Sequence, residues 1–252
     1  MLLLRRCAVA NFIAQLDPRN LRRIYIAALV GLWASGCSEG RTDAVLATVL
    51  AVDGTCTARE FGARESAPLV SGIALRPSTI LTTGVKGHVA LALLPNVRIE
   101  LTQNSELKII RLTLKKDGNE TGRAMRDRHV EVKLLQGSVV IAQVLRDWAK
   151  SRVYVETSNG ILVGDYESIF RIEHTDDITR AVCVRGIVEF HPNGSPVAVT
   201  LSPGTAGEWG HGQARIFPAE TDSRAQLELE EAVAGEARLR KLRSPAEKFP
   251  PP

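Results

Sequence analysis

The sequence predicts a mainly β fold, either a β-solenoid-like domain or an irregular sandwich, and three observations support this prediction. Short apolar runs recur from Ala44 onward, and some, such as Val97–Leu101 and Val130–Leu134, alternate strictly between apolar and polar side chains. A period of two places alternate side chains on opposite faces of a strand. Glycine-containing turns separate the runs. Only the C-terminal segment has a helical composition, so one helix is expected there.

Residues 1–36 have the composition of a signal peptide. Arg19, Arg22 and Arg23 precede an uncharged, mostly apolar run of eleven residues, Ile24–Ala34. A run of this length fits the apolar part of a signal helix and is shorter than the roughly 20 residues that a membrane-spanning helix needs. We therefore expect an N-terminal signal helix and export. The alternative is an N-terminal membrane anchor that is never cleaved.

The apolar run ends in Ala34-Ser35-Gly36-Cys37, which resembles the lipobox of bacterial lipoproteins, with Ala34 where that motif usually has Leu. In that family the cysteine thiol is lipidated and the chain is cut just before it. The resemblance implies lipidation of Cys37 and a membrane anchor on the periplasmic side or at the outer membrane. Each buried CH₂ of such an anchor contributes about 0.8 kcal/mol. Residues 37–44 are then expected to form a tether.

Removal of this leader changes the charge of the chain. The whole sequence has 32 Lys and Arg against 28 Asp and Glu, but residues 1–36 hold five Arg and a single acid, Asp17, so the remainder carries 27 of each sign. A neutral domain has no general electrostatic attraction for polyanions. The sequence therefore predicts no nucleic-acid partner.

Two cysteines remain in addition to Cys37. Cys56 and Cys183 would lie in an oxidising compartment after export, where they could form one disulfide. The alternative is a pair of buried free thiols, because cysteine also packs well as a small apolar residue.

The predicted strands follow one another from Val45 to Leu201. They are Val45–Asp53, Ser78–Thr83, Val89–Leu94, Val97–Leu101, Leu107–Ile109, Val130–Leu134, Val139–Leu145, Val153–Glu156, Phe170–Glu173, Ala181–Val184, Ile187–Phe190 and Val197–Leu201. The polar segment Lys115–Arg128 is predicted to be a loop.

Turn residues separate these strands, and three segments of the sequence form a weak repeat. Asp53-Gly54, Asn159-Gly160 and Asn193-Gly194 have the residue types that tight turns need. The segments around Gly137 (VKLLQGSVV) and Gly186 (AVCVRGIVE) are similar, and the segment around Gly54 (VLAVDGTCT) is a weaker third copy. Each copy is read as an apolar strand, a glycine turn and a second strand, as in repeated β units.

The C-terminal residues 218–252 are expected to form one helix and a proline-rich tail. Residues 222–242 are rich in Ala, Leu, Glu and Arg, and Asp222 or Ser223 can cap the helix. Leu227 and Ala234 belong to a thin apolar stripe. The helix is therefore expected to stand away from the domain or to pack on a partner.

An ordered set of apolar and glycine-containing segments runs through residues 45–217. They are the strand ending at Gly54, Leu75–Thr83 before Gly84, LLPNVRIELTQNSELKI (93–109), VKLLQGSVV (132–140), Thr157–Gly160, VCVRGIVEF (182–190) and VTLSPGTAGEW (199–209). In this order the segments resemble the FecR domain, known from the periplasmic part of iron-transport sensor proteins. One segment departs from the pattern: the family's Gly-Thr before a Phe is here the longer Val163–Phe170. The resemblance implies a FecR-type β domain without catalytic activity.

No pattern in the sequence indicates an enzyme, a cofactor or a metal site. The sequence has neither a GxSxG motif nor a GxGxxG motif that opens a helix. The five histidines are spread out, and the best local cluster, His174 with Asp176 and Asp177, is expected to be a solvated turn.

Two classes of function remain. The first is a binding, scaffold or sensory module of the cell envelope that contacts another envelope protein. The second is a carbohydrate- or cell-wall-binding surface protein. Four aromatic residues could line a groove for such a ligand, although packing in the core or at its rim is the alternative: Trp148, Tyr154, Tyr166 and Trp209.

Overall fold

The computed structural model describes residues 41–116, 125–143, 150–165, 167–210 and 213–242. The chain divides into two compact units, residues 1–40 and 41–252, and all described residues belong to the second. The predicted signal peptide, Cys37 and the proline-rich tail lie outside the described residues. In the described part, no helix combines the length and the apolar character needed to cross a membrane.

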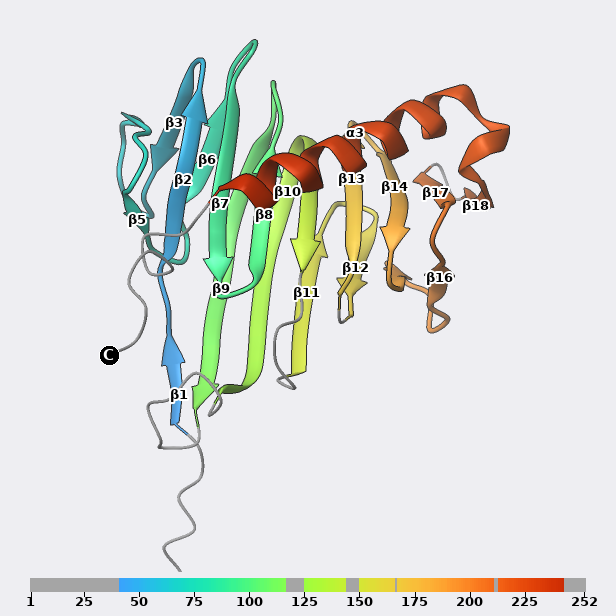
Figure 1. The fold of residues 1–252 in the computed structure, drawn as a ribbon, viewed down its shortest axis with the longest axis horizontal. Helices are drawn as coiled ribbons and strands as arrows, with labels where there is room; N and C mark the ends of the chain where they lie inside the picture. The colour runs from blue at the N-terminus through green and yellow to red at the C-terminus, as the bar shows by residue number, and fades with distance from the viewer. Residues whose placement is uncertain (1–40, 117–124, 144–149, 166, 211–212, 243–252) are drawn as a thin grey trace, which may run out of the picture. The chain divides into compact units, whose positions relative to one another are not determined.

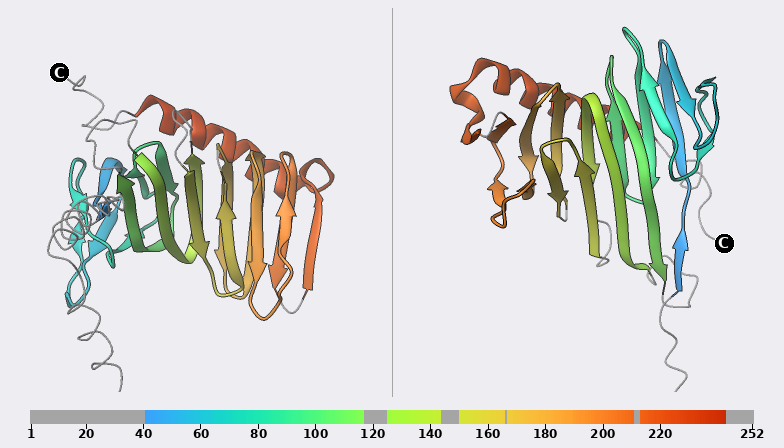
Figure 2. Two further views of the ribbon diagram at one scale, coloured as in Figure 1. Left: turned by 90° about the horizontal axis from the view of Figure 1, so that it is seen from below. Right: turned by 180° about the vertical axis from the view of Figure 1, so that it is seen from behind.

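The described residues form two β-sheets that face each other (Figures 1 and 2). The first, sheet A, has the order β4 (Ala67–Pro68), β3 (Cys56–Arg59), β6 (Ile80–Thr83), β9 (Glu106–Lys116), β10 (Met125–Gln143), β11 (Lys150–Glu156), β12 (Gly160–Gly164), β15 (Val188–Pro192) and β16 (Val199–Leu201), with β1 (Arg41–Ala44) beside the C-terminal part of β9. Of these pairings only β10–β11 is parallel.

The second, sheet B, is antiparallel throughout. Its order is β5 (Ala74–Leu75), β2 (Ala47–Asp53), β7 (His88–Leu94), β8 (Val97–Leu101), β10, β13 (Ile169–Thr175), β14 (Ile178–Arg185), β17 (Thr205–Gly210) and β18 (Gln213–Pro218). Strand β10 belongs to both sheets: it pairs with β9 up to Gln136 and with β13 from Gly137 onward. The predicted mainly β fold with one C-terminal helix is confirmed, and of the two expected architectures the pair of facing sheets corresponds to the irregular sandwich.

The glycines of the weak sequence repeat mark the points where the chain crosses between the sheets. Gly54 lies between β2 and β3, Gly137 lies at the bend of β10, and Gly186 lies between β14 and β15. Their φ angles are +69°, +87° and +76°, values that favour glycine. The expectation of two strands around Gly137 is wrong, because VKLLQGSVV is one continuous strand that bends there.

The core lies between the two sheets, where the inward side chains of the alternating strands meet. The largest fully buried side chains are Phe170, Phe190, Leu81, Leu91, Leu93, Ile99, Leu101, Leu107, Ile109, Leu112, Leu134 and Ile141. Burial of one such side chain contributes about 1.5–3 kcal/mol. All of these side chains except Leu112 belong to predicted strands of the FecR-like range.

Two segments differ from the sequence-based expectations. Arg41–Ala44, predicted to belong to the tether 37–44, form β1, because they pair with Thr113–Lys116 of β9. The predicted loop Lys115–Arg128 is shorter, because β9 continues to Lys116 and β10 begins at Met125. Residues 117–124 lie outside the described residues.

A 3₁₀ turn, η2 (Ala219–Thr221), leads into helix α3 (Ser223–Lys241). The side chain of Asp222 caps the helix by accepting a 2.8 Å hydrogen bond from the amide of Ala225, as predicted. The expected position of the helix was wrong: α3 packs across the outer face of sheet B on β14, β13, β10 and β8 (Figure 1). Leu227, from the expected stripe, is exposed.

Candidate functional site

Helix α3 meets sheet B through small and charged residues rather than through a row of large apolar ones. Its buried positions are Ala225, Glu228, Ala232, Gly235, Glu236 and Leu239. Small residues let the helix approach closely: a Cβ atom at Gly235 would lie 2.9 Å from Glu100 Oε2 and 3.1 Å from the Val140 side chain. The buried glutamates need cationic partners, because an unpaired carboxylate is costly to remove from water.

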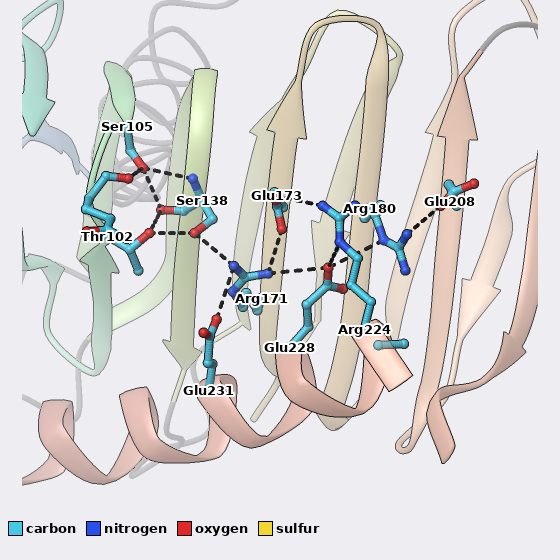
Figure 3. Close-up of polar contacts among 12 residues, drawn as sticks. Thr102, Ser105, Ser138, Arg171, Glu173, Arg180, Glu208, Arg224, Glu228 and Glu231 are labelled. Atoms are coloured by element: carbon cyan, nitrogen blue, oxygen red, sulfur yellow. Dashed lines mark hydrogen bonds and ion pairs between the residues drawn. The ribbon is translucent and has the colours of Figure 1, made fainter. Parts of the chain in front are cut away.

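Buried arginines of sheet B provide the partners of Glu228. Arg171 of β13 and Arg180 of β14 both lie on the outer face under α3. Glu228 Oε1 lies 3.4 Å from Arg180 Nε and 3.9 Å from Arg171 Nη1. Arg224, one helical turn earlier, contacts the same oxygen at 3.1 Å. Figure 3 shows this cluster joining the helix to two neighbouring strands.

Glu173 shares these arginines with Glu228. It accepts hydrogen bonds from Arg224 Nη2 at 2.9 Å and from Arg171 Nη1 at 3.2 Å. Burial raises the pKa of Glu228, although Arg180 and Arg171 act to lower it. Burial also acts to raise the pKa of Glu173, but Arg171 and Arg224 outweigh it, and this pKa is lowered. Of this coupled pair, Glu173 therefore ionises more readily than Glu228.

A second anchor holds the C-terminal half of α3. Arg238 donates two hydrogen bonds to the buried carboxylate of Glu100, with Nε–Oε1 at 2.8 Å and Nη2–Oε2 at 2.9 Å. Paired contacts of this geometry are among the strongest charge-assisted hydrogen bonds. Arg98 also donates to the carbonyl oxygen of Leu239 at 2.7 Å. The helix is thus fixed to sheet B by ion pairs along its length.

A groove of about 700 Å³ lies beside α3 on the outer face of sheet B. The helix contributes Glu231 and Arg238 to its wall, and sheet B contributes Val140 and Arg171. A hollow of about 260 Å³ shares part of this lining and extends toward Leu242. Four acids line the groove against two arginines and one histidine: Asp53, Glu100, Glu173, Glu231, Arg171, Arg238 and His88.

Hydroxyl groups fix the sheet wall of this groove at the bend of β10. Ser105 Oγ accepts a 2.9 Å hydrogen bond from the Ser138 amide, and Thr102 Oγ1 lies 2.5 Å from Ser138 Oγ. Ser138 Oγ also accepts from Arg171 Nη2 at 3.2 Å. These bonds connect the bend to the arginine cluster under α3 (Figure 3). The wall is therefore a preformed surface rather than a loose loop.

The histidine cluster is not assembled as a site. His174 is buried, with Nδ1 3.1 Å from the carbonyl oxygen of Ile178 and Nε2 3.2 Å from Ser158 Oγ. Asp176 and Asp177 lie exposed in the turn between β13 and β14, as expected for a solvated turn, but His174 points into the structure. Across the described residues, no three His, Cys, Asp or Glu side chains lie close enough together to hold a metal ion.

Cys56 and Cys183 are both free and buried, so the structure corresponds to the second alternative for this pair. Cys56 opens β3 of sheet A, whereas Cys183 lies in β14 of sheet B. Cys183 Sγ lies 3.5 Å from the carbonyl oxygen of Arg185, and burial raises the pKa of its thiol to about 11. Each thiol therefore behaves as a packed apolar group.

Two of the four aromatic residues considered for a ligand groove are described, and neither lines the groove beside α3. Trp209 is buried and its ring centroid lies 4.0 Å from that of Phe190. Tyr154 is half-buried on sheet A, 4.7 Å from the ring of His129. Trp148 and Tyr166 lie outside the described residues. Trp209 is core packing, the alternative given for these side chains.

The sequence alone did not reveal Arg171, Arg180 and Glu228. Arg171 lies between apolar Phe170 and Ile172, and Arg180 lies between Thr179 and Ala181. A charged residue at such a position in a strand is typical of a face turned to water. Glu228 belongs to a helix full of charges. Ala225, Ala232 and Gly235 fall on one face of the helix. This row of small residues was the feature of the sequence that could have indicated close packing of the helix, because small residues on one helix face permit close packing.

Comparison with known proteins identifies the β domain. The family model described as "FecR protein" matches residues 79–189, which run from just before β6 into β15. No curated protein matches the chain.

Two solved structures that match this chain are each described as a "putative anti-sigma factor" from Parabacteroides distasonis ATCC 8503. The structure at 2.50 Å resolution has a TM-score of 0.39 and 16% identity, and the alignment covers 55% of this chain and 59% of that one. The structure at 1.65 Å has a TM-score of 0.40 and 13% identity, with coverage of 63% and 74%.

The matched family range lies within the expected range 45–217, and the chain therefore contains a FecR domain, which spans residues 79–189.

Proposed function

We propose that this protein is a non-catalytic regulatory module of the cell envelope that binds another envelope protein. The observation that carries the proposal is the FecR domain at residues 79–189. Export by the signal peptide and lipidation of Cys37 would place the domain at a membrane surface, on the periplasmic side or at the outer membrane. Scaffolding or sensing then depends on which partner the domain contacts.

The groove beside α3 is the surface that we assign to this partner. Its wall is preformed and its lining combines apolar Val140 with charged side chains that already have partners, such as Glu100 and Arg238. Acidic residues outnumber arginines there, so a partner segment that carries Lys or Arg is favoured electrostatically. The open, mixed lining suits a peptide segment better than a small apolar ligand.

Photo-crosslinking in native membranes tests this assignment. A photoreactive residue in place of Gln103, on the exposed rim of the groove, is expected to crosslink to one defined segment of one protein, identified by mass spectrometry. The same residue in place of exposed Thr200, on the other sheet, is the matched control. The substitution Asp53→Lys should abolish the Gln103 crosslink. Equal crosslinking from both positions would contradict a partner site in the groove.

Carbohydrate or cell-wall binding, the second class of function, receives no support from the described aromatic residues. Trp209 is buried against Phe190, and Tyr154 packs on His129.

A further inference from the structure

Strand β18 forms one edge of sheet B and pairs on one side only, with β17. It has six residues, whereas the other strands with a single partner in the described part of the chain have four residues or fewer. These are β1, β4, β5 and β16. The end of sheet B formed by β18 thus presents the longest unpaired edge among the described strands (Figures 1 and 2).

The backbone geometry shows which groups of β18 face outward. The amide of Ala219 donates to the carbonyl oxygen of Gly204 at 2.9 Å, in register with the β17–β18 ladder. Because ladder bonds alternate along an antiparallel strand, Phe217, Arg215 and Gln213 face β17. The N–H and C=O groups of Ala214 and Ile216 face away from it. Pro218, which has no N–H group, also falls on the outward side.

This edge lacks most of the features that usually prevent strand addition. Edge strands of soluble proteins are typically short, kinked by bulges, or marked with lysine or proline. Strand β18 pairs with β17 without a register shift, and its proline is the last residue. By contrast, β4 and β5, at the opposite ends of the two sheets, have only two residues each. The Ile216 side chain is 45% exposed although it is apolar.

We propose that the outer edge of β18 accepts an extended strand of a partner protein, with an acidic residue opposite Arg215 and apolar residues opposite Ala214 and Ile216. Main-chain hydrogen bonds would supply the affinity and the alternating side chains the specificity. Arg215 is held over the sheet by Glu208 at 3.3 Å and by the ring of Phe217 at 4.9 Å. A carboxylate on the added partner strand would form an ion pair with Arg215.

Charge argues against a second copy of this chain as the occupant. Arg215 lies near the middle of β18, which carries no acidic residue. In a two-fold pairing of β18 with itself, the two Arg215 side chains would be direct or diagonal neighbours, and like charges at such positions are destabilising. The surface is separate from the groove beside α3, so the inference does not depend on the partner assigned to that groove.

Peptide binding to the full chain tests the proposal. The probe is a fluorescein-labelled peptide, Thr-Val-Glu-Val-Thr-Val, and its binding is followed by fluorescence anisotropy, together with hydrogen exchange at the amides of Ala214 and Ile216. We expect saturable binding that slows exchange at both amides. Ala214→Pro, which removes an outward donor but no bond to β17, should weaken binding at least tenfold, whereas Ala214→Thr should keep it.

A charge swap tests the predicted side-chain contact. Arg215→Glu should weaken binding of the glutamate peptide at least tenfold and favour a peptide with Lys in place of Glu. Equal binding by the Ala214→Pro and Ala214→Thr variants, or no saturable binding to the wild-type chain, would overturn the proposal. Sedimentation that shows self-association of the wild-type chain, lost in Ala214→Pro, would also overturn it in favour of a second copy. Crosslinking from Gln103 should be unaffected by these variants, so the two experiments distinguish a failure of this proposal from a failure of the proposed function.

Discussion

Single glycines decide where this chain changes sheets. Gly137 combines a φ of +87° with a neighbouring backbone that leaves no room for a side chain: a Cβ atom there would lie 2.5 Å from Ser105 Cα. Gly186 is similar, with Ser168 Cα at 2.9 Å. The repeated glycines in the sequence thus reflect a steric requirement at each point where the chain passes between the sheets. Close packing at these points is expected to matter as much as the backbone angle.

The substitution Gly137→Ala separates these two effects. Gly194 has a similar φ of +76° but nothing within 4 Å of the added Cβ atom. Gly194→Ala should lower the free energy of unfolding by about 1–2 kcal/mol, the cost of a left-handed backbone. Gly137→Ala should cost at least about 2 kcal/mol more, because Ser105 must move. Urea denaturation of both variants measures the difference, and equal losses would show that Ser105 yields freely.

At the scale of the element, α3 is held on sheet B by charge as much as by apolar contact. Arg180 contacts three acids, Glu208 at 2.8 Å, Asp222 at 3.4 Å and Glu228 at 3.4 Å. Because Arg180 is buried, its removal leaves the buried carboxylate of Glu228 with one cation fewer inside the interface. Exposed pairs such as Arg215 with Glu208 are screened by water and contribute little.

Arg180→Ala should therefore lower the free energy of unfolding by about 3 kcal/mol, the range for one partner of a buried ion pair. Arg215→Ala, the control on an exposed pair with the same Glu208, should change it by less than about 1 kcal/mol. Both values come from urea denaturation at pH 7. A loss of similar size in the two variants would mean that burial does not strengthen the Arg180 contacts.

Glu228→Gln tests the same interface through pH. Since the pKa of Glu228 is raised, this group contributes stability that is present below its unfolded pKa and lost as pH rises through its folded pKa. Glutamine cannot ionise, so the variant should lose less stability than the wild type between pH 4 and pH 7. If the two pH profiles have the same slope, the raised pKa of Glu228 is ruled out.

At the scale of the whole molecule, a domain of sheets A and B follows a predicted export signal. The two ends of the sandwich differ: short strands β4 and β5 lie at one end, and the longer edge strand β18 lies at the other. The predicted anchor is the part of this organisation that is simplest to test.

Cys37→Ser should abolish lipidation of the chain. The expected result is a diacyl or triacyl mass on Cys37 of the membrane-extracted wild type, measured by mass spectrometry, and its absence in the variant. Cys56→Ser, which changes a buried thiol of the β domain, should leave the lipid in place. An intact leader without lipid in the wild type would refute export as a lipoprotein.

The sequence by itself determined the β class, the positions of many strands although not of β12, β17 or β18, the single C-terminal helix with a cap at Asp222 or Ser223, and the FecR resemblance. These features depend on local periodicity, turn residues and capping, which are all set by residues close together in the chain. Only the tertiary structure decided that β10 serves both sheets, that α3 lies on sheet B, and that Arg171, Arg180 and Glu228 meet beneath it. Such contacts join residues distant in the chain, and in the sequence an arginine on a covered face looks the same as one facing water.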